Sequence, residues 1–149
     1  MKNFAKKPLL VAVVFAVVLA TQSSSAAPAL PNPILFIVSQ EFATVSGRQI
    51  VRYNYDVFNK DAYPADMFAA APNLAPCGAN RNSSRTWVDF YDQQGKKLNG
   101  FCALAKPSDL GKIWIAFEVD TVPPSWVYIE MTDRKTNTKY KSNLAETIL

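Results

Sequence analysis

The sequence contains no histidine among its 149 residues. This absence excludes Ser-His-Asp and Cys-His nucleophile systems and removes the commonest protein ligand of transition metals. Two cysteines are too few for a zinc site of four cysteines, or of two cysteines and two histidines. The five glycines form no glycine-rich run, so a P-loop and a dinucleotide-binding fingerprint are both missing. We therefore expect no catalytic residue, no metal site and no cofactor.

Residues 1–26 have the pattern of a secretory signal peptide. A basic start is followed by an unbroken apolar run at 9–20, and small residues precede Ala27. The basic residues are Lys2, Lys6 and Lys7. Twelve apolar residues give about 18 Å of helix, short of the ~30 Å hydrocarbon core that an uncleaved anchor would cross. We predict cleavage, no membrane span in the mature chain and a secreted or periplasmic protein, with an uncleaved anchor as the alternative.

Removal of the signal also removes most of the positive charge. The whole chain has sixteen basic and twelve acidic residues, and cleavage leaves thirteen basic residues against the twelve acidic ones, or +1. Nucleic-acid binding needs a concentrated basic face. The one local pair, Arg81 and Arg85, is too sparse to form such a face. We therefore expect no nucleic-acid partner.

Export also bears on the two cysteines. In an oxidising compartment Cys77 and Cys102 are predicted to form a disulfide. The bridge would close a loop of 26 residues and stabilise the fold by roughly 3.5 kcal/mol on chain-entropy grounds. A reactive redox pair is the alternative, but the 25-residue separation is far wider than the Cys-X-X-Cys spacing of such pairs.

The remaining chain has the pattern of an all-β domain. Residues 27–33 contain three prolines and predict an extended linker, and residues 34–149 predict a single domain. Alternation of apolar and polar residues predicts about seven short strands with turns between them. The expected strands are 34–38, 48–59, 85–91, 97–104, 112–119, 126–132 and 139–143, with a short helix after Pro64. This pattern favours one antiparallel β-sandwich held by one disulfide.

Several motifs resemble a known family. They are Tyr53-Asn-Tyr-Asp-Val-Phe-Asn, Tyr63-Pro-Ala-Asp-Met-Phe, Pro76-Cys-Gly-Ala-Asn, Ser84-Arg-Thr-Trp-Val-Asp-Phe-Tyr-Asp, Gly100-Phe-Cys-Ala-Leu, Asp133-Arg-Lys and Tyr140-Lys-Ser-Asn. Together they resemble a family of small, uncharacterised bacterial exported domains. The run 126–143 resembles the closing strand pair of immunoglobulin-like or fibronectin type III-like domains. The resemblance implies a sandwich fold and bacterial export, and it implies no activity.

Three carboxylates are candidates for chemistry. Asp89 and Asp92, with Asp56 nearby, would bind calcium or act as an acid/base pair. However, the segment lacks the Asp-x-Asp-x-Asp-Gly pattern of a calcium-binding loop, and Asp92 is a residue type common in turns. Structural roles are therefore the favoured interpretation.

Aromatic side chains are the stronger binding candidates. Trp87 shares a strand face with Asp89 and Tyr91, and Trp126 shares one with Tyr128. An exposed aromatic row is a signature of binding surfaces, whereas packing in the core or at its rim is the ordinary alternative. Trp114, between two isoleucines, is expected to be buried.

Two arginines complete the candidate set. Arg85 and Arg134 adjoin strand ends, where they would pair with Asp89 or Asp133, or recognise an acidic ligand. The leading hypothesis is a non-catalytic exported binding module for a protein or glycan at the cell envelope. It would use the aromatic row or an unpaired sheet edge. The alternatives are a small carboxylate-dependent hydrolase and a periplasmic enzyme inhibitor with a disulfide-stapled loop.

Overall fold

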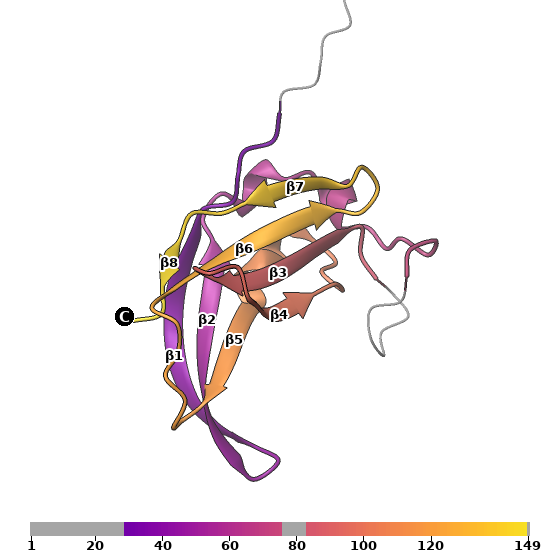
Figure 1. The fold of residues 1–149 in the computed structure, drawn as a ribbon. Helices are drawn as coiled ribbons and strands as arrows, with labels where there is room; N and C mark the ends of the chain where they lie inside the picture. Colours follow the sequence, from indigo (N-terminus) through magenta and orange to yellow (C-terminus); the bar gives the residue numbers. More distant parts are fainter. Residues whose placement is uncertain (1–28, 76–82, 149) are drawn as a thin grey trace, which may run out of the picture.

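Two antiparallel sheets make up the computed structural model of the chain, which describes residues 29–75 and 83–148 (Figure 1). The strands are β1 (Leu35–Val45), β2 (Arg48–Val57), β3 (Thr86–Asp92), β4 (Lys97–Phe101), β5 (Ile113–Glu118), β6 (Trp126–Asp133), β7 (Thr138–Lys141) and β8 (Ala145–Glu146). The 3₁₀ helices are η1 (Lys60–Ala62), η2 (Ala65–Phe68) and η3 (Pro107–Lys112). The helix expected after Pro64 is thus a single short 3₁₀ segment, η2.

The strands divide between the sheets in a simple order. One sheet has the order β1-β2-β5, and the other has the order β4-β3-β6-β7, with β8 pairing the start of β6. All of these pairings are antiparallel. The chain crosses from the first sheet to the second after β2, returns for β5, and crosses again to β6 (Figure 1). The prediction of an all-β fold made of antiparallel strands is confirmed.

The core lies between the sheets and consists of the apolar residues that alternate along each strand. On β2, Tyr53, Tyr55 and Val57 point inward and are buried, as the alternation predicts. On β3 and β6 the inward residues are fully buried, while their neighbours on the other face are mostly part-exposed. These inward residues are Val88, Phe90, Val127, Ile129 and Met131. Burial along β2, β3 and β6 therefore follows the predicted period of two.

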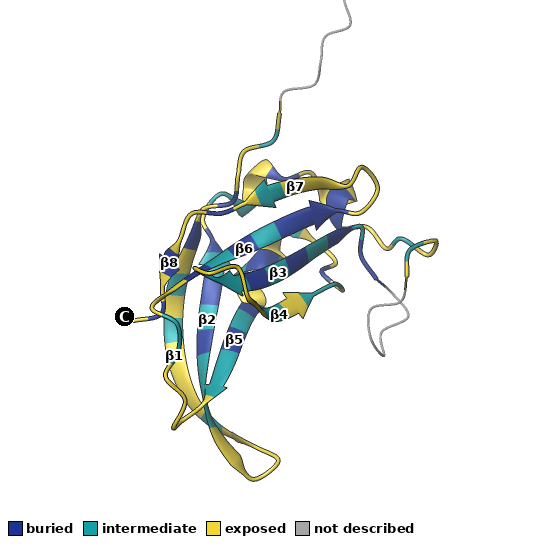
Figure 2. Cartoon of the chain, in the orientation of Figure 1, coloured by how far each residue is buried: buried dark blue, intermediate teal, exposed yellow. Residues whose placement is uncertain are grey.

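The first strand is much longer than its apolar run indicates. Residues 34–38 predict a strand of five residues, but β1 continues to Val45. Its extension pairs with β2 across a two-residue turn in which Ser46 and Gly47 have φ values of 51° and 79°. Two left-handed residues match the twist of a tight hairpin, so this turn extends the pairing into a polar segment. The resulting hairpin projects beyond the second sheet and is largely exposed (Figure 2).

Trp114 is not in the core, so the prediction for it is wrong. It pairs with Asn54 on β2 and is half-buried, whereas its neighbours Ile113 and Ile115 point inward and are buried. The guanidinium carbon of Arg52 lies 4.8 Å from the centroid of the Trp114 ring. Two flanking isoleucines cannot specify which face a strand buries, because both alternating sets are apolar.

The start of β1 is tied to the end of the described chain. The Asn143 side chain accepts a hydrogen bond from the Leu35 amide at 2.8 Å and donates one to the Leu35 carbonyl at 3.0 Å. Gln40 Nε2 donates to the carbonyl of Thr147 at 2.8 Å. One side-chain amide therefore takes the place of a neighbouring strand at the beginning of β1.

The proline-rich segment before β1 is docked onto the domain. The Tyr63 hydroxyl donates to the carbonyl of Pro31, and Asn59 Nδ2 donates to the carbonyl of Asn32. Burial raises the pKa of Tyr63 to about 12.

Within residues 29–75 and 83–148, no helix is long and apolar enough to cross a membrane.

Candidate functional site

The predicted aromatic residues gather on the outer face of β3 and β6. Antiparallel register places Tyr91 opposite Tyr128 and Asp89 opposite Glu130. We call this surface the β3–β6 face. Its residues on these two strands are Trp87, Asp89, Tyr91, Trp126, Tyr128, Glu130 and Thr132. Five of the seven binding residues predicted from the sequence are thus brought to one side of one sheet.

The aromatic rings of this face are largely covered by each other and by cations. Tyr91 and Tyr128 stack with centroids 5.3 Å apart and an interplanar angle of 17°. Lys141 Nζ lies 4.0 Å from the Tyr128 centroid, and the guanidinium carbon of Arg134 lies 4.5 Å from that of Trp87. Cation–π contacts of this kind are worth about 0.5–1 kcal/mol at exposed sites. Arg134, another predicted residue, therefore belongs to this face.

Trp126 is the most exposed aromatic residue of the face. It is 37% exposed and pairs across the sheet with Glu146 of β8. Among the described residues, no ring or cation stacks on its indole. Its accessible surface is therefore open to another molecule.

Each carboxylate of the face has its own lysine. Asp89 Oδ1 lies 2.7 Å from Lys97 Nζ on β4, and Glu130 Oε1 lies 2.7 Å from Lys139 Nζ on β7. The hydrogen bond that Lys139 Nζ donates to Glu130 raises the pKa of Lys139. The result is a row of charges across four strands, Lys97–Asp89–Glu130–Lys139, in which each acid is neutralised by an outer base.

Glycine at position 100 leaves room for this charge row. Gly100 pairs with Asp89 on the neighbouring strand. A Cβ at this position would lie 2.6 Å from Asp89 Oδ1 and 3.4 Å from Lys97 Nζ. A larger residue here would therefore displace the Asp89–Lys97 ion pair.

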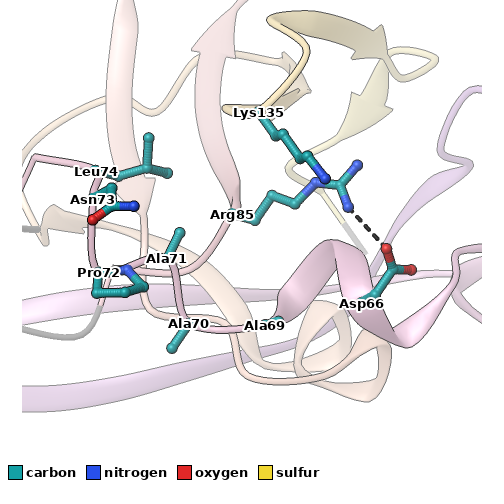
Figure 3. Close-up of a pocket in the computed structure, with 9 residues that line it drawn as sticks. All are labelled: Asp66, Ala69, Ala70, Ala71, Pro72, Asn73, Leu74, Arg85 and Lys135. Carbon is teal, nitrogen blue, oxygen red and sulfur yellow. Dashed lines mark hydrogen bonds and ion pairs between the residues drawn. The ribbon is translucent and has the colours of Figure 1, made fainter.

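Arg85 turns away from the β3–β6 face. Its Nε and Nη2 each donate to the carboxylate of Asp133 at 2.7 Å, and its Nη1 donates to Asp66 at 2.9 Å (Figure 3 shows the Asp66 pair). The predicted pairing of Arg85 with Asp133 is confirmed, and the pairing with Asp89 is wrong. Asp133 is nearly buried, with a side chain 4% exposed, whereas that of Asp66 is 72% exposed. Asp133 and Asp66 therefore already neutralise the positive charge of Arg85, which an acidic ligand would have to bind.

A pocket of about 450 Å³ opens beside this ion pair. It is lined by Asp66, Ala69, Ala70, Ala71, Pro72, Asn73, Leu74, Arg85 and Lys135. Figure 3 shows the charged side chains on one side and the small apolar residues on the other. Its lining has two bases, Arg85 and Lys135, and one acid, Asp66. The charge of Arg85 is already engaged by Asp66 and Asp133, so Lys135 is the cation of the lining that Arg85's acid partners do not occupy.

The ion pair predicts a loss of stability in acid. The hydrogen bond from Arg85 lowers the pKa of Asp133 to about 2, from an ordinary value of 3.8. A lowered pKa stabilises the folded state above the ordinary pKa, and that contribution disappears as the pH falls toward 2. We expect Asp133 to contribute roughly 2 kcal/mol of this loss between about pH 5 and pH 2. Urea unfolding at both pH values should show a smaller loss for Asp133→Asn than for the wild type, and equal losses would contradict the assignment.

The three carboxylates considered for metal or acid/base chemistry do not meet. Asp56 lies on the outer face of the other sheet, where it accepts hydrogen bonds from the Val57 amide and Lys60. Asp92 accepts from the amides of Gln94 and Lys96, which is the turn role expected of it. Over the residues that the structure describes, no group of three or more His, Cys, Asp or Glu side chains could hold a metal ion.

The predicted disulfide and the loop of the inhibitor hypothesis depend on Cys77, which lies outside the described residues. Cys102 follows β4, and its carbonyl accepts the Ser84 amide at 2.8 Å. The bridge between the two cysteines therefore stays a prediction.

Sequence reasoning missed the cations of the β3–β6 face. Lys97 lies on β4 beside β3, and Lys139 and Lys141 lie on β7 beside β6. Each lysine contacts a residue diagonally across from it on the adjacent strand, so its partner follows only from the strand order. The alternation of Lys139 and Lys141 along β7 is a usable signal, but it does not say which strands are adjacent.

The resemblance to a family of exported domains stays a prediction. In comparisons with protein-family models, with curated proteins and with solved structures, the chain shows no significant match.

Proposed function

We propose that this protein is a non-catalytic, exported binding module that contacts a protein partner at the cell envelope through its β3–β6 face. The observation that carries this proposal is the register that puts Trp126, Tyr128 and Tyr91 on one sheet surface among paired charges. Protein interfaces are enriched in Tyr, Trp and Arg, with charged residues toward the rim. The β3–β6 face has this composition.

The ring contacts favour a protein over a glycan as the partner. A sugar that stacks on an aromatic residue needs an uncovered ring face. Tyr91 and Tyr128 cover each other, Lys141 lies over Tyr128, and Arg134 lies over Trp87. Trp126 remains as a single open ring. One ring among ion pairs suits the anchor of a protein interface better than it suits a sugar platform.

Strand order supports an immunoglobulin-like or fibronectin type III-like sandwich for this module. The order β1-β2-β5 corresponds to strands A, B and E of such domains, and β4-β3-β6-β7 corresponds to C′, C, F and G. Domains of this class commonly serve as binding modules at cell surfaces. This support comes from the fold alone and does not identify a partner.

The ion pairs argue against the hydrolase alternative. Asp89 and Glu130 are cross-strand neighbours, so two carboxyl groups do lie side by side. Each is bound to a lysine at 2.7 Å, on the outer face of a sheet. A general acid works in an enclosed site and needs a proton to give, whereas these two carboxylates are held in ion pairs on an open sheet face.

Photo-crosslinking in the producing cell tests the proposal. We expect benzoylphenylalanine at position 126 to cross-link to one dominant protein. The matched control is the same residue at position 58, where Phe58 is 75% exposed at the end of β2 and away from this face. A second substitution, Lys139→Glu, should remove the cross-link at position 126, because it reverses one end of the charge row.

Three results would contradict the proposal. They are equal cross-linking at positions 58 and 126, no cross-linking at position 126, and a cross-link that persists in Lys139→Glu. Binding to a glycan array that disappears in Trp126→Ala would assign the face to a sugar instead. Trp126 is partly exposed, so circular dichroism of the variant should match the wild type.

A further inference from the structure

The first strand has an open edge. Among the strands of the described residues, β1 pairs only with β2, and the two-residue turn makes Val45 and Arg48 the first pair of the hairpin. Next to such a turn, alternate residues exchange hydrogen bonds with the partner strand, beginning with the pair that flanks it. Val45, Ala43 and Glu41 therefore bond to β2. The amides and carbonyls of the intervening residues, Gln40, Phe42 and Thr44, point to the open edge.

No partner satisfies these groups within the described part of the chain. The side chain of Asn143, which we call the Asn143 clamp, bonds to β1 at Leu35, and Gln40 makes its hydrogen bond to Thr147 through its side chain. No hydrogen bond from residues 29–75 or 83–148 reaches the outward amides or carbonyls of Gln40, Phe42 and Thr44. Their edge therefore has the geometry to accept another strand.

The same edge lacks the features that usually prevent strand pairing. Over its eleven residues β1 has one charged residue, Glu41, and no proline. The edge strand β7 has Lys139 and Lys141, and the edge strand β4 is short and begins with Lys97. On β5 the carbonyl of Trp114 is occupied by Asn99 Nδ2 at 2.8 Å. Lysines, short strands and local covers are the ordinary protections of sheet edges, and the outer half of β1 has none of them.

An apolar side chain stands at the centre of this open stretch. Phe42 is 80% exposed, although it lies on the side of the sheet that faces the core. It pairs with Val51, which in turn pairs with Phe117, and both pack at the margin of the core. Figure 2 shows the exposed end of this hairpin extending past the second sheet. Phe42 thus continues the apolar layer into solvent.

We propose that a second copy of this chain covers the edge, with the two β1 strands pairing antiparallel about a two-fold axis at Phe42. The strand is self-complementary in this register. Phe42 faces Phe42 of the second copy, Gln40 faces Thr44, and the single charge of Glu41 faces Ala43. No like charges meet, and aromatic pairs stabilise antiparallel strands. The product is a continuous six-stranded sheet in the order β5-β2-β1-β1-β2-β5, with both Phe42 rings in one apolar layer.

Light scattering and hydrogen exchange test the geometry together. The purified chain should change from one copy to two as its concentration rises. At high concentration the amides of Gln40, Phe42 and Thr44 should exchange roughly tenfold or more slowly than at low concentration. Those of Glu41, Ala43 and Val45 should be protected at both concentrations, because β2 already binds them.

A matched pair of variants decides whether the β1 edge is responsible. Phe42→Asp places two like charges opposite each other and should leave the protein as a single copy at every concentration. Phe58→Asp makes the same substitution at a side chain that is 75% exposed, outside β1, and should still form two copies. A wild-type chain that stays a single copy would overturn the proposal. So would a Phe42→Asp variant that still pairs, or a benzoylphenylalanine at position 42 that cross-links only to a different protein.

Discussion

Replacement of Asp133 by alanine is expected to lower the free energy of unfolding by about 3–5 kcal/mol. Arg85 has a side chain only 18% exposed, and Asp133 supplies two of its three hydrogen bonds. Removal of the carboxylate leaves the guanidinium poorly solvated and with one of its three hydrogen bonds, the one to Asp66. The Lys135 amide and the Thr136 hydroxyl also lose their acceptor, so the turn between β6 and β7 is loosened. Urea denaturation followed by circular dichroism measures the difference.

The other partner of Arg85 provides the control. The Asp66 side chain is 72% exposed and makes one ion pair with the same arginine at 2.9 Å. Surface pairs of this kind contribute about 0–1 kcal/mol, so Asp66→Ala should be nearly neutral. If the two alanine variants proved equally stable, the bidentate contact with Asp133 would not be what holds this corner of the fold.

Asn143→Ala should be the second largest loss, about 2–3 kcal/mol. Leu35 is 2% exposed, and the Asn143 amide satisfies both its amide and its carbonyl. Alanine leaves these two buried backbone groups without a partner. An unsatisfied buried group costs about 1–3 kcal/mol, more than the roughly 1 kcal/mol that an average hydrogen bond contributes. The measurement is again the free energy of unfolding in urea.

Two further variants separate the clamp from a general effect of losing an asparagine. Asn143→Asp can still accept the Leu35 amide but cannot donate to the carbonyl, so it should fall between the wild type and alanine. Asn73→Ala removes an exposed asparagine and should change stability by less than about 0.5 kcal/mol. A loss in Asn143→Asp as large as that in Asn143→Ala would mean that the donated bond carries the whole effect.

The parts of the fold that the sequence predicts correctly are those that depend only on the alternation of residues within one strand. Alternation assigns the inward residues of β2, β3 and β6, and it places Trp87 and Tyr128 on outer faces. It fails at Trp114, where both faces read as apolar, and at the outer half of β1, whose pairing depends on the Ser46–Gly47 turn. A polar segment becomes a strand there because its neighbour is one, and composition alone cannot express that dependence.

The candidate site divides in the same way. The aromatic residues of the β3–β6 face follow from the period of their own strands. The lysine partners of Asp89 and Glu130 require the cross-strand register, and so does the adjacency of the two carboxylates. The Arg85–Asp133 contact joins the start of β3 to the end of β6, because Thr86 pairs with Asp133. The opposite charges of these residues suggest the contact from sequence. The antiparallel register of β6 beside β3 is what places Asp133, and not Asp89, next to Arg85.

The clamp at the start of β1 also determines how the domain would respond to tension. Leu35 contacts Asn143 and Gln40 contacts Thr147, so the residue numbers rise together and the two segments run in the same direction. A pull on the two ends of the described chain would slide these segments past each other in shear. The hydrogen bonds at Asn143 and Thr147 would then bear the load at the same time, instead of opening one after another as in a peeled hairpin. A module tethered at one end and held by its partner would keep its fold under such a force longer than the same bonds in a peeling geometry would allow.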